Sequence, residues 1–177
     1  MDKVKKYIPG ILLADTALFT VLFIVVRLIL QLFRVTFRKW FRVLCLFLIM
    51  VGIIAGIIQL LLKIRKKAVR IAAVSIFILF ITAACVITYP IAIFAVAGEE
   101  HVVERDEGKF VAYVDGFLHT YVYYYEYKNF LICGEVKRIE EDYGKGGFDP
   151  IGNPYGHEYS VVSTKYYDEE GNAVSSY

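Results

Sequence analysis

The sequence predicts an α+β membrane protein, in which three transmembrane helices are followed by a small antiparallel β-sheet domain. The 177-residue chain is 58% hydrophobic, above the apolar content of about 45–50% that is usual in soluble domains. Its charge is divided, with a net +11 over residues 1–98 and a net −9 over residues 99–177. Twelve of the fourteen tyrosines lie in the second part. We therefore expect a transmembrane region up to Gly98 and a Tyr-rich, acidic β domain after it.

Three apolar segments are long enough to cross a membrane, which requires about 20 mostly apolar residues. The predicted spans cover about residues 8–33, 43–62 and 71–97, and the last two contain no charged residue. The first contains Asp15 and Arg27, which lie near its ends, where an ionisable group costs less than at the bilayer centre. The chain is thus expected to be a multi-pass protein in contact with the lipid bilayer.

Polar and basic residues recur every three or four positions through the end of the first span and beyond it: Arg27, Gln31, Arg34, Arg38 and Arg42. One interpretation extends the first helix as a basic amphipathic helix in the headgroup region, with a tryptophan as interfacial anchor. The alternative is a charged loop whose arginines reach the headgroups. In either case, the residues expected to contact lipid headgroups are Arg27, Arg34, Arg38, Trp40 and Arg42.

The second span contains Gly52 and Gly56 in a G-x-x-x-G pattern. Such a pair lets two helices approach closely. Packing against the other spans of the same chain is the expected role. Binding to a larger membrane complex is the alternative.

The distribution of basic residues predicts the orientation. With three spans, the amino-terminus and the loop between the second and third spans share one side, and together they hold eight Lys and Arg. The other side holds four, or five with Arg27, before the acidic domain begins. The excess of basic residues in cytoplasmic loops favours a cytoplasmic amino-terminus and an extracytoplasmic carboxyl-terminal domain. The arginines that follow the first span count against this orientation.

Short runs of aromatic and β-branched residues, separated by turn residues, follow Gly98 and predict an antiparallel meander of about five or six strands. Asp115-Gly116 predicts a two-residue hairpin turn with positive φ at both positions. D-E-G after Arg105 and D-E-E-G-N from Asp168 predict two further turns. The β-like runs on which this expectation rests are 101–105, 109–114, 117–128, 129–133, 135–143, 157–167 and a short last run.

Tyrosines alternate along the third of these strands. Phe117, His119 and four tyrosines up to Tyr127 share one face, while Leu118, Thr120, Val122 and Tyr124 share the other. Sheet packing is the first interpretation of the aromatic face, and a recognition surface is the alternative. Nucleic acid is disfavoured as a partner because this half is acidic. The candidate binding surface is Tyr121, Tyr123, Tyr125, Tyr127, Tyr143, Phe148 and Asp149.

Other residues that could carry chemistry form no recognisable motif. The histidines, at 101, 119 and 157, are scattered, and surface histidines without a metal are expected. Glu140-Glu141-Asp142 is interpreted as a solvated charged loop, and Asp149, before Pro150, as a turn initiator. We expect no catalytic residue, no metal and no cofactor.

Three runs carry a resemblance: V-V-E-R-x-x-G-K-x-V-A-Y-V, Y-Y-x-Y-x-N-F and Y-G-x-G-G-F-D-P. Over about residues 101–172 the chain resembles small, uncharacterised membrane-anchored proteins of Gram-positive bacteria, in which a Tyr-rich domain follows a transmembrane anchor. The resemblance implies an extracytoplasmic domain, and it implies no activity and no functional residue.

The leading hypothesis is a non-enzymatic integral membrane protein that displays its β domain for recognition, sensing or immunity-type protection. Its partner would be a protein or a component of the cell envelope. The rival hypothesis is an accessory subunit of a membrane transporter or enzyme complex, acting through its helices. An envelope enzyme is a third, weaker alternative. The sequence leaves the oligomeric state open.

Overall fold

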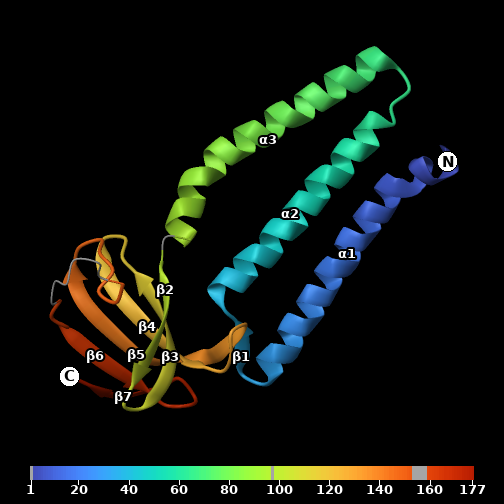
Figure 1. Ribbon diagram of the computed structural model, residues 1–177. Helices are drawn as coiled ribbons and strands as arrows, with labels where there is room; N and C mark the ends of the chain where they lie inside the picture. The colour runs from blue at the N-terminus through green and yellow to red at the C-terminus, as the bar shows by residue number, and fades with distance from the viewer. Residues whose placement is uncertain (1, 97, 153–158) are drawn as a thin grey trace. The chain divides into compact units, whose positions relative to one another are not determined.

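The computed structural model in Figure 1 has three long helices and a seven-stranded antiparallel sheet, which confirms the expected fold class. It describes residues 2–96, 98–152 and 159–177, with the side chains of 11–88, 98–152 and 159–177. The helices are α1 (Asp2–Leu32), α2 (Lys39–Leu62) and α3 (Lys67–Val96). The strands are β1 (Val35–Phe37), β2 (Glu100–Arg105), β3 (Gly108–Asp115), β4 (His119–Tyr127), β5 (Ile132–Lys145), β6 (Ser163–Tyr167) and β7 (Ala173–Ser176).

The chain folds as two compact units. The helical unit comprises Met1–Leu28 and Phe41–Pro90, and the β unit comprises Ile29–Trp40 and Ile91–Tyr177. The connection between the first two helices therefore belongs to the β unit, although the sequence predicts a transmembrane region up to Gly98. Each helix contains a segment long and apolar enough to cross a membrane: Ile11–Leu32, Lys39–Leu62 and Lys67–Thr88.

The two glycines of α2 face α1 within the helical unit. A Cβ added to Gly52 would lie 2.5 Å from the Thr16 hydroxyl oxygen, and one added to Gly56 would lie 2.3 Å from Leu13. The Thr16 hydroxyl donates a hydrogen bond to the Leu12 carbonyl at 2.8 Å, which restricts its rotation. The small residues thus allow the close contact between α1 and α2, as the packing interpretation expects.

The predicted extension of the first helix is wrong. Helix α1 ends at Leu32, and Arg34 adopts a left-handed backbone conformation with a φ of 53°, which terminates a helix. The next residues form β1, and the Arg34 carbonyl accepts a hydrogen bond from Glu135 N at 3.0 Å. Val35 and Thr36 are β-branched and favour a strand. The four arginines therefore do not share one helix: Arg27 lies in α1, Arg34 and Arg38 flank β1, and Arg42 lies in α2.

The sheet is a meander with the order β2-β3-β4-β5-β6-β7, and β1 pairs with β5 off this path. Cys133 of β5 is paired with Tyr127 of β4 on one edge and with Thr36 of β1 on the other. Further along β5, residues 139–142 pair with β6. The edge of β5 opposite β4 is therefore shared by β1 and β6.

Two expected strands differ from those observed. Residues 132–145 form one long strand, whereas 129–131 turn between β4 and β5. The Asn129 side-chain oxygen accepts hydrogen bonds from Leu131 N and Ile132 N at 2.8 and 3.0 Å, and these bonds hold the turn. Only Ser163–Tyr167 of the expected strand 157–167 is strand, and residues 153–158 lie outside the described part.

The predicted two-residue hairpin at Asp115-Gly116 is also wrong. Neither residue has a positive φ, and β4 begins only at His119. A Cβ on Gly116 would lie 3.1 Å from the Phe148 carbonyl oxygen, so this glycine permits a close backbone approach. The D-E-G turn is confirmed, because Arg105 and Gly108 pair across Asp106-Glu107. The turn from Asp168 is confirmed too, with Gly171 at a φ of 90°.

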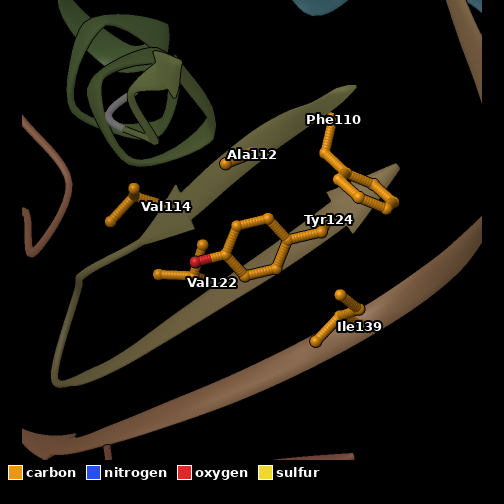
Figure 2. Close-up of a cluster of buried hydrophobic side chains, with 6 residues drawn as sticks. All are labelled: Phe110, Ala112, Val114, Val122, Tyr124 and Ile139. Atoms are coloured by element: carbon orange, nitrogen blue, oxygen red, sulfur yellow. The ribbon is translucent and has the colours of Figure 1, made fainter. Parts of the chain in front are cut away.

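The core of the β unit lies on one face of β3, β4 and β5. Figure 2 shows its buried members, and Phe110 and Tyr124 meet edge to face with ring centroids 6.5 Å apart. Thr120, Val122 and Tyr124 are buried, as the alternation of β4 predicts. Such an aromatic pair adds about 0.5–1.5 kcal/mol beyond its buried area. The buried cluster is Phe110, Ala112, Val114, Val122, Tyr124 and Ile139.

Candidate functional site

The face of β4 opposite the core carries an aromatic row, which we define as His119, Tyr121 and Tyr123. The rings of His119 and Tyr121 stack with centroids 4.8 Å apart and an interplanar angle of 24°. Those of Tyr121 and Tyr123 stack at 6.2 Å and 17°. All three side chains are half-buried. Because the rings face one another, they present their edges and polar ends to a partner rather than their flat faces.

Charged residues of β5 and β6 lie beside the row. Lys137 Nζ is 5.1 Å from the centre of the Tyr123 ring and 4.3 Å from that of Tyr167, within the range of a cation–π contact. Lys137 also forms an ion pair with Glu140. Glu140 accepts a hydrogen bond from the Tyr167 hydroxyl at 3.0 Å, and Lys165 Nζ lies 3.3 Å from its other oxygen. Burial alone would raise the pKa of Glu140, but Lys137 and Tyr167 outweigh it and lower that pKa.

Two hydroxyl groups of the row are available for binding. Within the described part of the chain, neither the Tyr121 nor the Tyr123 hydroxyl has a hydrogen-bond partner. Burial, and then the negative charges of Glu140 and Asp115, raise the pKa of Tyr123, so its hydroxyl stays protonated at neutral pH and can donate. The row therefore offers hydrogen-bonding groups on a rigid strand, the arrangement that tyrosines supply at protein interfaces.

Tyr125 and Tyr127 of the candidate surface lie further along the same strand and pack inside the β unit. The Tyr125 ring meets that of Tyr113 at 5.4 Å and 64°. The Tyr127 ring is in contact with two cations, with Arg38 Cζ 5.7 Å and Lys109 Nζ 4.8 Å from its centre. These two tyrosines therefore support the packing of the β unit.

The remaining candidates do not join the row. Asp142 pairs with Tyr121, so the next residue, Tyr143, points to the opposite face of the sheet and packs against the core. Phe148 stacks on Tyr159 with centroids 4.1 Å apart. Asp149 is bound to His101. The structure thus brings Tyr121 and Tyr123 together and places Tyr143, Phe148 and Asp149 elsewhere in the β unit.

A buried ionic network replaces the expected solvated loop at 140–142. Strand β5 continues through this segment, so Glu141 points into the core and is 6% exposed. Arg105 Nη2 donates to the two carboxylate oxygens of Glu141 at 2.8 and 2.9 Å, and the hydroxyls of Tyr124 and Tyr143 donate to it at 2.6 and 2.9 Å. Burial, followed by the nearby Glu141 charge, raises the pKa of Tyr143 to about 12. Every member is paired, as a buried charge requires, and we assign the network a structural role.

The structure also gathers a histidine cluster, which we define as Glu99, His101 and Asp149. His101 Nε2 lies 2.6 Å from Asp149 Oδ2 and 3.6 Å from Glu99 Oε2. The neighbouring Asp149 carboxylate raises the pKa of Glu99. Burial would raise the pKa of Asp149, but hydrogen bonds from Gly152 N and Ile151 N outweigh it and lower that pKa. One imidazole and two carboxylates are groups that could hold a metal ion.

Spacing along the sequence could not reveal this cluster, because Asp149 is 48 residues from His101. His119 forms a separate pair with Asp142 at 2.7 Å, and His157 lies outside the described residues. Both described histidines are thus bound to a carboxylate rather than scattered on the surface.

The basic residues after the first helix have partners within the β unit. Arg38 is 7% exposed and forms an ion pair with Glu100 at 2.5 Å. Arg34 Nη1 donates to the Glu169 carbonyl at 3.1 Å, and Trp40 packs on Phe130 with centroids 4.8 Å apart. Arg27 lies in α1 and Arg42 in α2. Contact of these residues with lipid headgroups stays a prediction.

Comparisons with protein-family models, with curated proteins and with solved structures found no match.

Proposed function

We propose that this membrane protein is a non-enzymatic recognition protein, which displays its β unit outside the cytoplasm and binds a partner protein through the aromatic row. The observation that carries the proposal is the pair of hydroxyls of Tyr121 and Tyr123, which are half-buried on a stacked row and have no hydrogen-bond partner among the described residues. Strand-borne side chains lose little conformational freedom on binding, which favours recognition.

The geometry favours a protein over a sugar. A sugar ring stacks on an exposed aromatic face, whereas the faces of Tyr121 are covered by His119 and Tyr123. Ring edges and hydroxyls instead suit the backbone and side chains of a protein. Residues 99–177 have a net charge of −9, and adding Arg34, Arg38 and Lys39 to them brings the sum to −6. A partner with a basic surface fits this charge.

An extracytoplasmic position is supported by the basic residues. The loop between α2 and α3 and the start of α3 hold Lys63, Arg65, Lys66, Lys67 and Arg70. This positive segment favours the cytoplasm. On the other side, Arg38 pairs with Glu100 and Lys39 Nζ donates to the Gly98 carbonyl at 2.9 Å. These basic residues stabilise the fold of the β unit. Their presence on this side of the membrane is therefore compatible with an extracytoplasmic position, even though basic residues are more common in cytoplasmic loops.

The test places a photo-crosslinking amino acid at Lys165, which lies beside the row and is 48% exposed. A second chain carries it at Glu107, an exposed residue of the β2–β3 turn. In living cells we expect a protein adduct from Lys165 and none from Glu107. Replacing Tyr121 and Tyr123 by phenylalanine keeps both rings and removes both hydroxyls. The Lys165 adduct should then fall about fivefold or more, since each lost hydrogen bond costs about 0.5–1.5 kcal/mol.

Equal adducts at both positions, or an adduct from Lys165 that the phenylalanine variants leave unchanged, would contradict the proposal. Adducts from positions in the helices alone would favour the rival accessory-subunit hypothesis. Against that rival hypothesis, Gly52 and Gly56 pack against Thr16 and Leu13. This packing supports a role in contacts between helices of the same chain rather than in binding another protein.

A further inference from the structure

We propose that Glu99, His101 and Asp149 form a binding site for a transition-metal ion, with Zn²⁺ as the best-fitting ion. The site would be held by one imidazole nitrogen and two carboxylate oxygens. This inference is independent of the aromatic row, whose residues the site does not use.

The spacing of the donor atoms fits such an ion. Bonds of about 2.1 Å to nitrogen and oxygen place neighbouring ligand atoms about 3.0–3.4 Å apart in octahedral or tetrahedral geometry. His101 Nε2 lies 2.6 Å from Asp149 Oδ2 and 3.6 Å from Glu99 Oε2, and all three ligand atoms lie within 4.8 Å of one another. The ligand atoms would have to move relative to one another by a few tenths of an ångström to about one and a half ångströms to coordinate one ion. Glu99 is the side chain free to make the larger shift, because it is 66% exposed.

The backbone already positions two of the three ligands. The Glu99 carbonyl accepts a hydrogen bond from Val114 N at 2.9 Å, which attaches this residue to β3. Asp149 Oδ1 accepts from Ile151 N at 2.9 Å and Gly152 N at 3.0 Å, so Oδ2 is left directed at His101. Partners of this kind orient metal ligands and raise affinity. A Cβ on Gly152 would lie 2.4 Å from Asp149 Oδ2, so only glycine leaves this oxygen accessible.

The charge of the cluster favours a cation. Two carboxylates share one imidazole, so even a protonated His101 leaves one negative charge unbalanced. Among the described residues, no Lys or Arg forms an ion pair with Glu99 or Asp149. The other histidine pair differs in this respect, since His119 meets one carboxylate, Asp142, whose Oδ1 also accepts from Gly144 N at 2.7 Å. A divalent ion would remove the imbalance at Glu99, His101 and Asp149.

The donor set selects the kind of ion. Imidazole nitrogen suits Zn²⁺ and its neighbours, whereas Ca²⁺ and Mg²⁺ prefer oxygen ligands alone. Three protein ligands leave at least one position for water. Glu99 directly precedes β2, His101 lies in β2, and Asp149 follows β5. A bound ion would therefore hold Asp149 against the sheet and stabilise the β unit.

The test uses the full chain in lipid nanodiscs, stripped of metal and titrated with ZnCl₂ by calorimetry and by thermal unfolding. Asp149→Asn keeps the side-chain oxygen that accepts hydrogen bonds from Ile151 N and Gly152 N, and replaces the oxygen that would bind the ion. Glu99→Gln removes the second carboxylate at an exposed side chain. His119→Asn at the other histidine pair is the matched control. We expect one Zn²⁺ site in the wild type and in His119→Asn, with a rise in the unfolding temperature. Binding should weaken at least about tenfold in Asp149→Asn and Glu99→Gln.

Three outcomes would overturn the site: no Zn²⁺ binding by the wild type, unchanged binding in both ligand variants, or a loss in His119→Asn in their place. Equally strong stabilisation by Ca²⁺ or Mg²⁺ would overturn the choice of ion. Cys45, Cys85 and Cys133 are free thiols that could also bind Zn²⁺. In that case cysteine substitution would weaken Zn²⁺ binding and Asp149→Asn would not. This result would also count against the site.

Discussion

Arg38 Nε lies 2.5 Å from the Glu100 carboxylate, and the two side chains are only 9% and 10% exposed. This ion pair joins the connection between α1 and α2 to the first residue of β2, which follows α3. Arg38 also donates to the Phe130 carbonyl at 3.3 Å, and its backbone N donates to the Leu131 carbonyl at 2.9 Å. Arg38, whose spacing is typical of a basic amphipathic helix, is therefore part of the interior of the β unit.

Removing one partner of this pair should destabilise the β unit more than removing both. Arg38→Ala leaves the Glu100 charge buried and unpaired, and a loss of about 3–5 kcal/mol in the free energy of unfolding is expected. The double variant Arg38→Met, Glu100→Leu removes both charges and should lose less. The chain has a single tryptophan, Trp40, which packs on Phe130, so its fluorescence during urea unfolding reports on this region. Additive losses in the double variant would show that the two residues do not act as a pair.

Residues 99–177 should not form a stable domain without β1. That fragment leaves the edge of β5 at residues 132–134 without its partner strand, and it leaves Glu100 without Arg38. Unpaired edges promote aggregation. A fragment in which residues 33–40 are fused to residue 99 through a flexible Gly/Ser linker should unfold at a higher temperature and stay monomeric. Equal unfolding temperatures for the two fragments would mean that β1 contributes nothing to the sheet.

The β unit should lose stability in acid through Glu140. The pKa of Glu140 is lowered in the folded state, where burial is outweighed by Lys137, Tyr167 and Lys165. A lowered carboxyl pKa contributes stability above the unfolded value, about 4.3, and this contribution is lost as the pH falls through the folded value. Glu140→Gln should therefore show a smaller decrease in the free energy of unfolding between pH 6 and pH 3. Glu104→Gln, at a side chain 82% exposed, is the control and should follow the wild type.

Enlarging Gly52 should disturb the contact between α1 and α2. Its Cβ would meet the oxygen of Thr16, a side chain held by its hydrogen bond to Leu12, so Gly52→Val should cost about 1–3 kcal/mol. Gly56→Ala should cost less, because the nearest atom belongs to the flexible end of Leu13. Val51→Leu, at a side chain 43% exposed, is the control. Thermal unfolding in detergent gives the order, and a larger loss for Gly56→Ala would contradict this packing.

The sequence predicted the features that depend on local pattern. Charge-free runs of 20 residues or more predicted α2 and α3, and alternation in β4 predicted that Val122 and Tyr124 lie inside. The spacing of the basic residues predicted a helix at Arg34 and Arg38, and this was wrong. Basic residues can be three or four positions apart in a turn and beside a strand as well as in a helix. Contacts between distant residues carry no local pattern. Glu141 inside the core and Asp149 beside His101 follow from the register of β5 and from the connection after it.

Only part of the predicted binding surface lies together in the structure, for the same reason. Alternation placed Tyr121 and Tyr123 on one face, and they stack there. A strand over 135–143 was predicted and contains Tyr143, but its pattern does not say which of its faces meets the core. That depends on the register between β4 and β5, in which Asp142 pairs with Tyr121.

The arrangement of the chain across the membrane is tested most directly by labelling single introduced cysteines with a membrane-impermeant maleimide in intact cells. Suitable positions in a cysteine-free background are Val174 in β7, Phe33 after α1 and Arg65 between α2 and α3. Because β1 is hydrogen-bonded to β5, Phe33 and Val174 should be labelled together from outside. Arg65 should be labelled only after lysis. Labelling of Phe33 and Val174 from opposite sides would contradict three spans with a shared sheet, and labelling of Arg65 alone would place the β unit in the cytoplasm and contradict the proposed function.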